Sequence, residues 1–467
     1  MWDFNRYADN TAVITEDGRR IDYGELARRS DALARAAGKR SLIFNLCSNT
    51  FGSLLGYTAF LTHRIVPLML DEHIDAELLN NFLNLYGPDA LWVPEAKADT
   101  FEGEKIYGDE GYVLIRRAGG GLSPLHDELA LLLTTSGSTG SPKFVRQSYM
   151  NLKANTDSIV RYLELDATEK AITTLPMNYT YGLSIINTHL AVGAALILTR
   201  KTLMQREFWE QFSEFGATSF GGVPYTYEML DRLRFFRRDL PTLRTMTQAG
   251  GKLSPELHRK FAEYAQKTGK HFVVMYGQTE ATARMAYLPA DKSLEKYGSM
   301  GIAIPGGRFK LIDVDGQEIT ASDTVGELVY EGANVTLGYA EKGEDLARGD
   351  ERHGILVTGD MARRDADGFY YVVGRKKRFL KIFGNRVNLD ETERLLKSHF
   401  DGLDCACAGR DDEMHVYVTD ESRMRDVKSF LAEKSRLNPT AFKILFIPAV
   451  PKNEAGKTLY AKLENAS

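Results

Sequence analysis

Short apolar runs alternate with longer segments of helical periodicity through about the first 300 residues. Residues 206–215 and 255–267 show helical periodicity, and Asp22 with Glu25 three residues later predicts the capped start of an earlier helix. Apolar strands that alternate with helices are typical of parallel sheets covered on both faces, so we predict an α/β fold for this part. The expected strands are 41–46, 90–93, 129–134, 171–175, 195–198, 245–249 and 272–276.

The pattern changes after about Gly301. Strand-like runs separated by short turns, such as the one at Asp315 and Gly316, predict an antiparallel β subdomain. A basic run at 375–378 follows it, and the remaining residues predict a small α+β domain whose first helix is capped by Asn388. The expected elements are strands 309–314, 326–330 and 368–373, then strands 416–419 and 443–447 with helix 424–434.

The composition is that of an ordinary folded protein. Of 467 residues, 43% are hydrophobic and 26% are charged, which excludes a disordered chain, a collagen and a long coiled coil. The formal net charge is −4. Proteins that grip nucleic acid usually carry a basic excess, so we expect no nucleic-acid partner.

The cysteines and the apolar segments indicate in which cellular compartment the protein is expected. Cys47, Cys405 and Cys407 are too few for a disulfide framework or for a zinc site of cysteines alone, and predict buried thiols in a reducing compartment. The first residues lack a basic region followed by an apolar one, so we expect no signal peptide and a cytoplasmic location. The apolar stretch 183–198 is shorter than the ~20 residues of a membrane span, and predicts a buried helix that runs into a strand.

The first segment with chemical character is 131–143. An apolar strand runs into small hydroxyl and glycine residues and ends at Pro142 and Lys143. Backbone N–H groups, hydroxyls and a lysine suit a polyphosphate, although a Ser/Gly-rich surface turn has the same composition. A Walker loop is excluded here, and also at 451–458, where Pro451 replaces the first glycine, so Lys457 is not a Walker lysine.

Two further segments suit a nucleotide. Tyr276, Thr279 and Glu280 follow a predicted strand, where a tyrosine can stack on a base, a threonine can contact a phosphate and a carboxylate can hold Mg²⁺. Asp360 precedes Arg375 by fifteen residues, and an aspartate can accept hydrogen bonds from both ribose hydroxyls. Taken alone, Thr279 and Glu280 could cap a helix, and Asp360 could be an ordinary aspartate in a turn.

In this order, the segments resemble the adenylate-forming superfamily of AMP-dependent synthetases and ligases, which includes acyl-CoA synthetases, free-standing adenylation domains and beetle luciferase. The resemblance covers about Tyr7 to Leu463. The segments that carry it are 134–143, 276–280, 358–360, 374–386 and 451–457.

The resemblance implies a two-domain arrangement. An N-terminal domain, 1–374, contains parallel α/β subdomains and the β subdomain at about 301–374. A hinge at 375–380 leads to a small mobile α+β domain, 381–467. The implied enzyme is an AMP-forming acid–thiol ligase, which activates a small carboxylic acid with ATP and Mg²⁺ as an acyl-AMP.

The acyl group then passes to the pantetheine thiol of CoA or of a carrier protein. A stand-alone enzyme that loads only a separate carrier protein is an alternative. A luciferase-like oxygenase and a catalytically inactive nucleotide-binding module are further alternatives.

The resemblance also implies roles for individual residues. Lys457 bridges the substrate carboxylate and the nucleotide, and Lys143 holds the departing phosphates. Thr279 contacts the α-phosphate, and Glu280 is the metal ligand. The implied nucleotide-binding residues are Thr135, Ser136, Gly137, Ser138, Thr139, Gly140, Gly250, Gly251, Tyr276, Gly277, Asp360, Val372 and Arg375.

Tyr179 and Thr180 are implied to line the acid pocket. Residues 175–183 contain no acidic side chain to pair with an α-ammonium, so we expect a neutral pocket and an acid that is not an α-amino acid. The hinge residue maps to Lys377. Lys381 and Gly384 belong to the loop that shapes the thiol tunnel.

Overall fold

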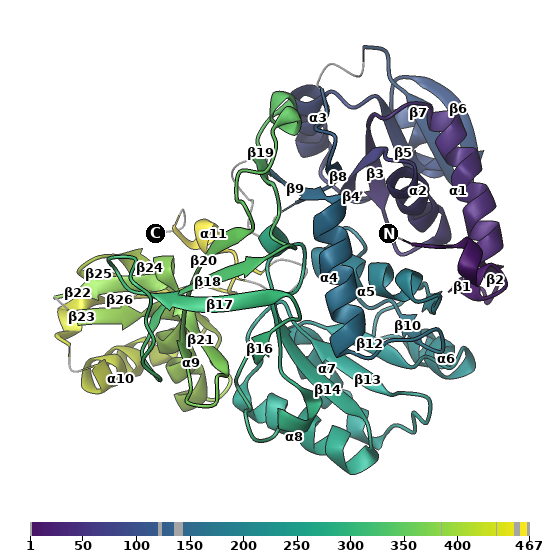
Figure 1. Ribbon diagram of the computed structural model, residues 1–467. Helices are drawn as coiled ribbons and strands as arrows, with labels where there is room; N and C mark the ends of the chain where they lie inside the picture. Colours follow the sequence, from purple (N-terminus) through teal and green to yellow (C-terminus); the bar gives the residue numbers. More distant parts are fainter. Residues whose placement is uncertain are drawn as a thin grey trace. The chain divides into compact units, whose positions relative to one another are not determined.

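The computed structural model describes residues 2–119, 124–134, 143–383, 385–435, 437–452 and 458–464. It contains two compact units, each described by itself. The first unit is Met1–Arg308 with Tyr330–Leu356, and the second is Phe309–Val329 with Val357–Ser467 (Figure 1). The predicted mixed α/β fold is confirmed, and the division at 375–380 stays a prediction.

A nine-stranded sheet forms one half of the first unit. The strands from β14 to β1 are parallel, and the pairs at the two ends are antiparallel. The order is β16 (Ile302–Ala303), β15 (Ala286–Tyr287), β14 (His271–Tyr276), β13 (Thr245–Gln248), β12 (Ser219–Gly222), β10 (Lys170–Ile172), β11 (Ala195–Ile197), β1 (Thr11–Ile14) and β2 (Arg20–Asp22).

An eight-stranded sheet forms the other half. Its central strands are parallel and flanked by antiparallel pairs. The order is β19 (Gly338–Ala340), β9 (Phe144–Ser148), β8 (Leu129–Thr134), β4 (Val66–Asp71), β3 (Leu42–Cys47), β5 (Ala90–Pro94), β7 (Tyr112–Arg116) and β6 (Glu104–Asp109). Each of the seven strands predicted in the first 300 residues is present.

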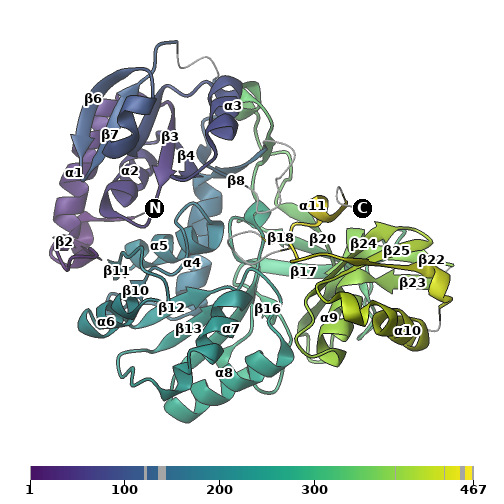
Figure 2. The same cartoon turned by 180° about the vertical axis from the view of Figure 1, so that it is seen from behind.

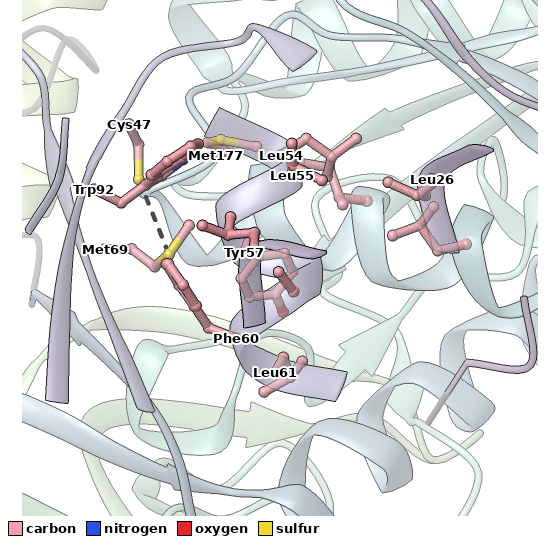
Figure 3. Close-up of a cluster of buried hydrophobic side chains, with 14 of the residues drawn as sticks. Leu26, Cys47, Leu54, Leu55, Tyr57, Phe60, Leu61, Met69, Trp92 and Met177 are labelled. Carbon is pink, nitrogen blue, oxygen red and sulfur yellow. Dashed lines mark hydrogen bonds between the residues drawn. The ribbon is translucent and has the colours of Figure 1, made fainter. Parts of the chain in front are cut away.

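One hydrophobic core joins the two sheets through helices. Figure 3 shows part of it, where Leu54, Tyr57 and Phe60 pack near Met69 and Cys47. The Cys47 Sγ lies 3.9 Å from the Met69 Sδ. The helices of the first unit are α1 (Tyr23–Ala37), α2 (Phe51–Thr62), α3 (Ala76–Tyr86), α4 (Tyr149–Tyr162), α5 (Thr180–Ala191), α6 (Arg206–Glu214), α7 (Pro224–Arg232) and α8 (Pro255–Thr268).

Helices cover both faces of the nine-stranded sheet, as predicted. Along β14, Phe272 packs against Tyr227 of α7 and Phe261 of α8. The next residues on the opposite face, Val273 and Met275, pack in a cluster with side chains of α5. Successive strand residues point to opposite faces, so both faces of β14 are buried. Figure 2 shows α7 and α8 on one side of this sheet and α4 and α5 on the other.

In the part of the chain that the structure describes, three small sheets lie wholly or mostly in the second unit. The four-stranded sheet has the order β17 (Gly307–Ile312), β18 (Gly326–Gly332), β20 (Ile355–Arg364) and β21 (Tyr370–Arg375). The β20–β21 pair is antiparallel, as predicted for this segment. The other strands and helices are β22 (Phe379–Ile382), β23 (Asn385–Asn388), α9 (Leu389–His399), β24 (Cys405–Arg410), β25 (Glu413–Val418), α10 (Met424–Ser435), β26 (Phe442–Phe446) and α11 (Tyr460–Glu464).

Both predicted helix caps are present. The Asp22 carboxylate accepts a hydrogen bond from the Glu25 N–H at 2.6 Å, and the Asn388 side chain caps α9. The Glu25 carboxylate pairs with Arg29 of the next turn, so the reciprocal half of a capping box is absent there. All three cysteines are buried and reduced. Across the described residues, no helix has the length and apolar character needed to cross a membrane.

Candidate active site

The segment after β14 makes a tight turn at Gly277. A Cβ at this position would lie 1.7 Å from the Ala283 carbonyl oxygen, so only glycine fits. Tyr276 ends the strand, and Thr279 and Glu280 follow on a short 3₁₀ helix, Thr279–Ala281. The strand therefore delivers four of the predicted site residues, Tyr276, Gly277, Thr279 and Glu280, to one sheet edge.

We expect the substitution Gly277→Ala to lower the free energy of unfolding by about 1–3 kcal/mol, because the methyl group forces two backbone segments apart. Denaturant titration measures this. Gly349→Ala is the matched control, since its Cβ would meet only the His126 ring at 3.4 Å. A Gly277→Ala protein as stable as this control would show that the turn is not sterically required.

Hydrogen bonds hold the backbone after Glu280 in place. The N–H and hydroxyl of Thr336 donate to the Glu280 carbonyl at 3.0 and 2.9 Å. The Asn334 side chain donates to the Arg284 carbonyl at 3.0 Å. Thr282 lies in the left-handed region with φ 66°, a strained conformation for a β-branched residue. These contacts fix the backbone positions from which the side chains of this segment extend.

Glu280 and Lys143 both contact Tyr339 of β19. The Tyr339 hydroxyl donates to Glu280 Oε1 at 2.7 Å. The Lys143 Nζ lies 4.1 Å from the centroid of the Tyr339 ring, and the Arg352 guanidinium lies 4.6 Å from it. We call Lys143, Glu280, Tyr339 and Arg352 the Tyr339 cluster. It brings a cation and a carboxylate, both predicted from the sequence, to one side chain.

The Tyr339 phenol stays protonated at neutral pH. Burial first, and then the Glu280 carboxylate, raise the pKa of Tyr339 to about 12. Its hydroxyl therefore remains a hydrogen-bond donor to Glu280. Among the described residues the Glu280 carboxylate forms no ion pair, so it can bind a cation.

Gly250 and Gly251 follow β13, and Gly250 has a left-handed φ of 83°. A Cβ on Gly250 would lie 2.6 Å from the Tyr179 hydroxyl, so the two residues pack closely. The Gln248 side chain donates to the Gly251 carbonyl at 2.9 Å. The structure thus brings a predicted nucleotide-binding residue, Gly250, next to a predicted acid-pocket residue, Tyr179.

Thr180 begins α5 and is buried. Its hydroxyl donates to the Thr282 carbonyl, so the first turn of α5 contacts the segment after Glu280. Thr180, Ser184 and Thr282 line a small cavity of about 10 Å³, which has room for about one water molecule. The assignment of Tyr179 and Thr180 to an acid pocket stays a prediction.

Asp360 and Arg375 are paired within the second unit. They face each other on β20 and β21, and the Arg375 Nε lies 2.8 Å from the Asp360 Oδ1. The Asp360 side chain is 3% exposed and the Arg375 side chain 61%, so the arginine reaches out from a buried carboxylate. Val372 lies on the same strand, β21.

The predicted hinge residue, Lys377, directly precedes Arg378, whose guanidinium makes several contacts. Lys377 lies in the short helix Lys376–Arg378, and its side chain is outside the described residues. The Arg378 guanidinium pairs with Asp390 at 2.8 Å and Glu393 at 2.5 Å, and lies 3.8 Å from the centroid of the Tyr460 ring. Tyr460 therefore ties the last helix, α11, to the residue beside the predicted hinge.

The predicted thiolation segment is a hairpin. β22 and β23 pair antiparallel, with Lys381 opposite Arg386. The Lys381 N–H donates to the Asp411 carboxylate at 2.7 Å. Several predicted site residues lie outside the described residues, and their roles stay predictions. They are Thr135, Ser136, Gly137, Ser138, Thr139, Gly140, Gly384 and Lys457.

The sequence did not reveal Tyr339 or Arg352. β19 is three residues long and pairs antiparallel with β9, almost two hundred positions earlier in the chain. A tyrosine in so short a segment carries no local signal of a site. Only the long-range pairing places it beside Lys143, which directly precedes β9.

Comparison with curated proteins finds CoA ligases. The chain is 30% identical over 347 residues to the peroxisomal OPC-8:0-CoA ligase 1 of Arabidopsis thaliana, a match that covers 71% of this chain and 63% of that protein. It is 30% identical over 357 residues to the sulfoacetate–CoA ligase of Cupriavidus necator, covering 73% and 68%. The match thus spans less than two thirds of the first relative's length.

Solved structures share the fold over nearly the whole chain. O-succinylbenzoate coenzyme A synthetase from Bacillus subtilis, in complex with AMP, has a TM-score of 0.79 at 20% identity, covering 99% of this chain and 97% of that one. ATP-bound MatB from Rhodopseudomonas palustris has a TM-score of 0.78 at 22% identity, covering 99% and 98%.

A family model described as "AMP-binding enzyme" matches residues 2–340, which is well over half of the sequence. Together with the shared fold, this match confirms the resemblance to adenylate-forming enzymes. The chain belongs to the AMP-binding enzyme family.

Proposed function

We propose that this protein uses ATP to activate a carboxylic acid, other than an α-amino acid, as an acyl-AMP, and then transfers the acyl group to the thiol of CoA. The names of its relatives support CoA rather than a carrier protein as the acceptor, since both are CoA ligases. A cytoplasmic location and the absence of a nucleic-acid partner stay predictions.

The observation that carries the proposal is the Tyr339 cluster. An ATP site needs a cation for the phosphates and a carboxylate for the metal that accompanies them. Lys143 and Glu280 supply these charges, and both contact Tyr339. The cluster lies on elements from three distant parts of the chain.

Glu280 fits Mg²⁺. This ion is usually bound by one or two protein carboxylates together with substrate phosphates, so a single carboxylate is sufficient. In the described parts of the chain, no group of three or more His, Cys, Asp or Glu side chains gathers as a larger metal site would. Bound Mg²⁺ would supply positive charge against the phosphates as negative charge develops on them.

In the first step, an oxygen of the substrate carboxylate attacks the α-phosphorus of ATP, and pyrophosphate leaves. Two anions must approach each other, so the site must reduce their repulsion. Lys143 would hold the departing phosphates, and Thr279 would contact the α-phosphate. Lys457 would hold the two reactants in line, a positional and electrostatic role.

Residues of both units are proposed to bind the nucleoside. Tyr276 would stack on adenine, with the backbone of Gly250 and Gly251 along the edge of the base. Asp360 would accept hydrogen bonds from the ribose hydroxyls, and Arg375 would support it, as their ion pair suggests.

In the second step, the thiol sulfur attacks the acyl carbon, and AMP leaves. We propose that the hairpin with Lys381 and Gly384 shapes the path of the pantetheine. A pivot at Lys377 would exchange this hairpin for the Lys457 segment, because one site must serve two reactions.

ATP–pyrophosphate exchange over a panel of carboxylic acids tests the proposed function. We expect exchange that depends on one class of acid and on Mg²⁺, followed by thioester formation when CoA is added. Thioester formed only on a separate carrier protein would show that the acceptor is that protein and not CoA. No exchange with any acid would favour an inactive nucleotide-binding module.

Removing the Tyr339 hydroxyl tests how Glu280 is oriented. In Tyr339→Phe the ring that contacts Lys143 remains, but the hydrogen bond to Glu280 is lost. We expect the Mg²⁺ concentration for half-maximal exchange to rise about ten-fold, since a hydrogen bond to a charged group contributes about 1.5 kcal/mol. A Mg²⁺ titration of the exchange reaction measures this.

Tyr371→Phe is the control, because the Tyr371 hydroxyl also donates to a carboxylate, that of Asp365, at 3.2 Å. It should leave the Mg²⁺ dependence unchanged. The assignment of Glu280 as the metal ligand is wrong if Tyr339→Phe and Tyr371→Phe show the same Mg²⁺ dependence.

A further inference from the structure

Arg284 is a buried arginine in the segment that follows Glu280. Its side chain is among the largest fully buried ones of the protein, and the residue is 2% exposed. A guanidinium is charged at every physiological pH, so this charge is held inside the first unit.

Within the described ranges, the partners of the Arg284 guanidinium are all neutral. It donates to the Ser184 hydroxyl at 2.9 Å, to the Tyr162 hydroxyl at 3.3 Å and to the Met275 sulfur. It also lies 4.4 Å from the centroid of the Tyr181 ring. The Nε is buried and finds no hydrogen-bond partner in the part of the chain that the structure describes.

No carboxylate compensates this charge among the described residues. The other fully buried large cation, Arg146, pairs with Glu351. Buried charges in proteins are normally paired, because an unpaired one is strongly destabilising. Arg284 departs from this rule, which points to an anion that is supplied from outside the chain.

The contacts of Arg284 suggest that this anion is part of the acid substrate, because they involve neighbours of the residues predicted to line the acid pocket. Ser184, which accepts a hydrogen bond from Arg284, lines the small cavity together with Thr180 and Thr282. Tyr181, whose ring lies against the guanidinium, is 6.3 Å from the Tyr179 ring, centroid to centroid.

The described contacts of the Arg284 side chain are neutral, and hydrogen bonds also hold its backbone. The Arg284 carbonyl accepts hydrogen bonds from Asn155 at 2.8 Å and Asn334 at 3.0 Å. The cavity has room for about one water molecule. Entry of an anionic group therefore requires side chains to move aside, as is common when a ligand binds.

We propose that the acid activated by this protein carries a second anionic group, and that the Arg284 guanidinium binds this group, with a dicarboxylic acid as the simplest substrate. The planar fork of a guanidinium matches a carboxylate. This inference rests on the proposed function, and it replaces the neutral pocket expected from residues 175–183 with one that carries a positive charge.

The test compares acids matched in length in the ATP–pyrophosphate exchange reaction. The probes are the dicarboxylates from malonate to adipate and the methyl-terminated monocarboxylates of equal carbon number. We expect the best dicarboxylate to exceed its monocarboxylate partner at least ten-fold in kcat/KM. In Arg284→Met this preference should disappear or reverse.

Thermal unfolding provides a second readout. Because Arg284→Met removes an uncompensated buried charge and keeps the volume, its Tm without ligand should equal or exceed that of the wild type. The dicarboxylate should raise the Tm of the wild type but not of Arg284→Met. Arg238→Met is the control, since Arg238 lies over the Trp209 ring and its Nε also finds no hydrogen-bond partner among the residues described. It should leave acid preference unchanged.

The outcomes separate the two levels of the proposal. Exchange that is as fast with monocarboxylates as with dicarboxylates in the wild type overturns the role of Arg284 and leaves acid activation standing. Absence of exchange with every acid overturns the proposed function. In that case, a Tm increase with dicarboxylate that Arg284→Met abolishes still supports the anion site, and no such increase overturns it. A large fall in Tm for Arg284→Met without ligand would show that the arginine is structural.

Discussion

Replacing Lys457 with alanine is expected to lower acid-dependent pyrophosphate exchange by about 100-fold or more, corresponding to ~3 kcal/mol of transition-state stabilisation. The reason is that this lysine would hold the carboxylate and the α-phosphate together while both carry negative charge. Thioester formation from preformed acyl-AMP should survive, because a different segment would serve that step. Both half-reactions are measured on the same purified variant.

Lys452→Ala is the matched control for Lys457→Ala. Lys452 lies in the same C-terminal segment, where it pairs with Asp404 at 2.6 Å. Its loss should change neither half-reaction by more than a few-fold. If Lys457→Ala loses both half-reactions equally, the division of work between two segments is wrong.

Replacing Lys377 with proline is expected to have the opposite effect on the two half-reactions: pyrophosphate exchange is kept and thioester formation is lost. On one side of Lys377, Arg375 is paired with Asp360. On the other side, Arg378 is bound to α9 through Asp390 and Glu393. A rotation between these anchors must change the backbone angles at Lys377, and proline fixes φ near −65° and removes an N–H.

If Lys377→Pro holds the adenylating arrangement, pyrophosphate exchange should stay within several-fold of wild type. Thioester formation should fall by ten-fold or more, because the hairpin with Gly384 would no longer reach the acyl-AMP. Lys377→Ala, which removes the side chain but leaves the backbone free, should keep both reactions. A folded Lys377→Pro protein that forms thioester at the wild-type rate would place the pivot elsewhere.

The seven strands that the sequence predicted in the first unit are present because their signals are local, but other strands of its two sheets, such as β4 and β9, were not predicted. The observed bounds of β8, Leu129–Thr134, match the prediction, since an apolar run there ends at a polar, glycine-rich segment. α2 behaves differently. It is buried on all sides, so its sequence has no polar face and no helical periodicity.

The site was only partly predictable, because burial and long-range pairing decide the rest. Glu280 and Lys143 stand in recognisable motifs, but Tyr339 joins them only through the pairing of β19 with β9. Arg284 also could not be predicted from the residues next to it in the sequence. Nothing in residues 281–284 distinguishes a buried unpaired arginine from an exposed one, and only its contacts with Ser184 and Tyr181 do so.

The most direct test of acid activation as an acyl-AMP follows an oxygen atom. The protein is given ATP, CoA and its best acid labelled with ¹⁸O in the carboxylate. If the carboxylate attacks the α-phosphorus, one labelled oxygen bridges the acyl group and AMP, and it stays on the phosphate when the thiol attacks the acyl carbon. The account predicts AMP that carries one ¹⁸O atom, as measured by mass spectrometry. Label in inorganic phosphate, or thioester formed with unlabelled AMP, would contradict it.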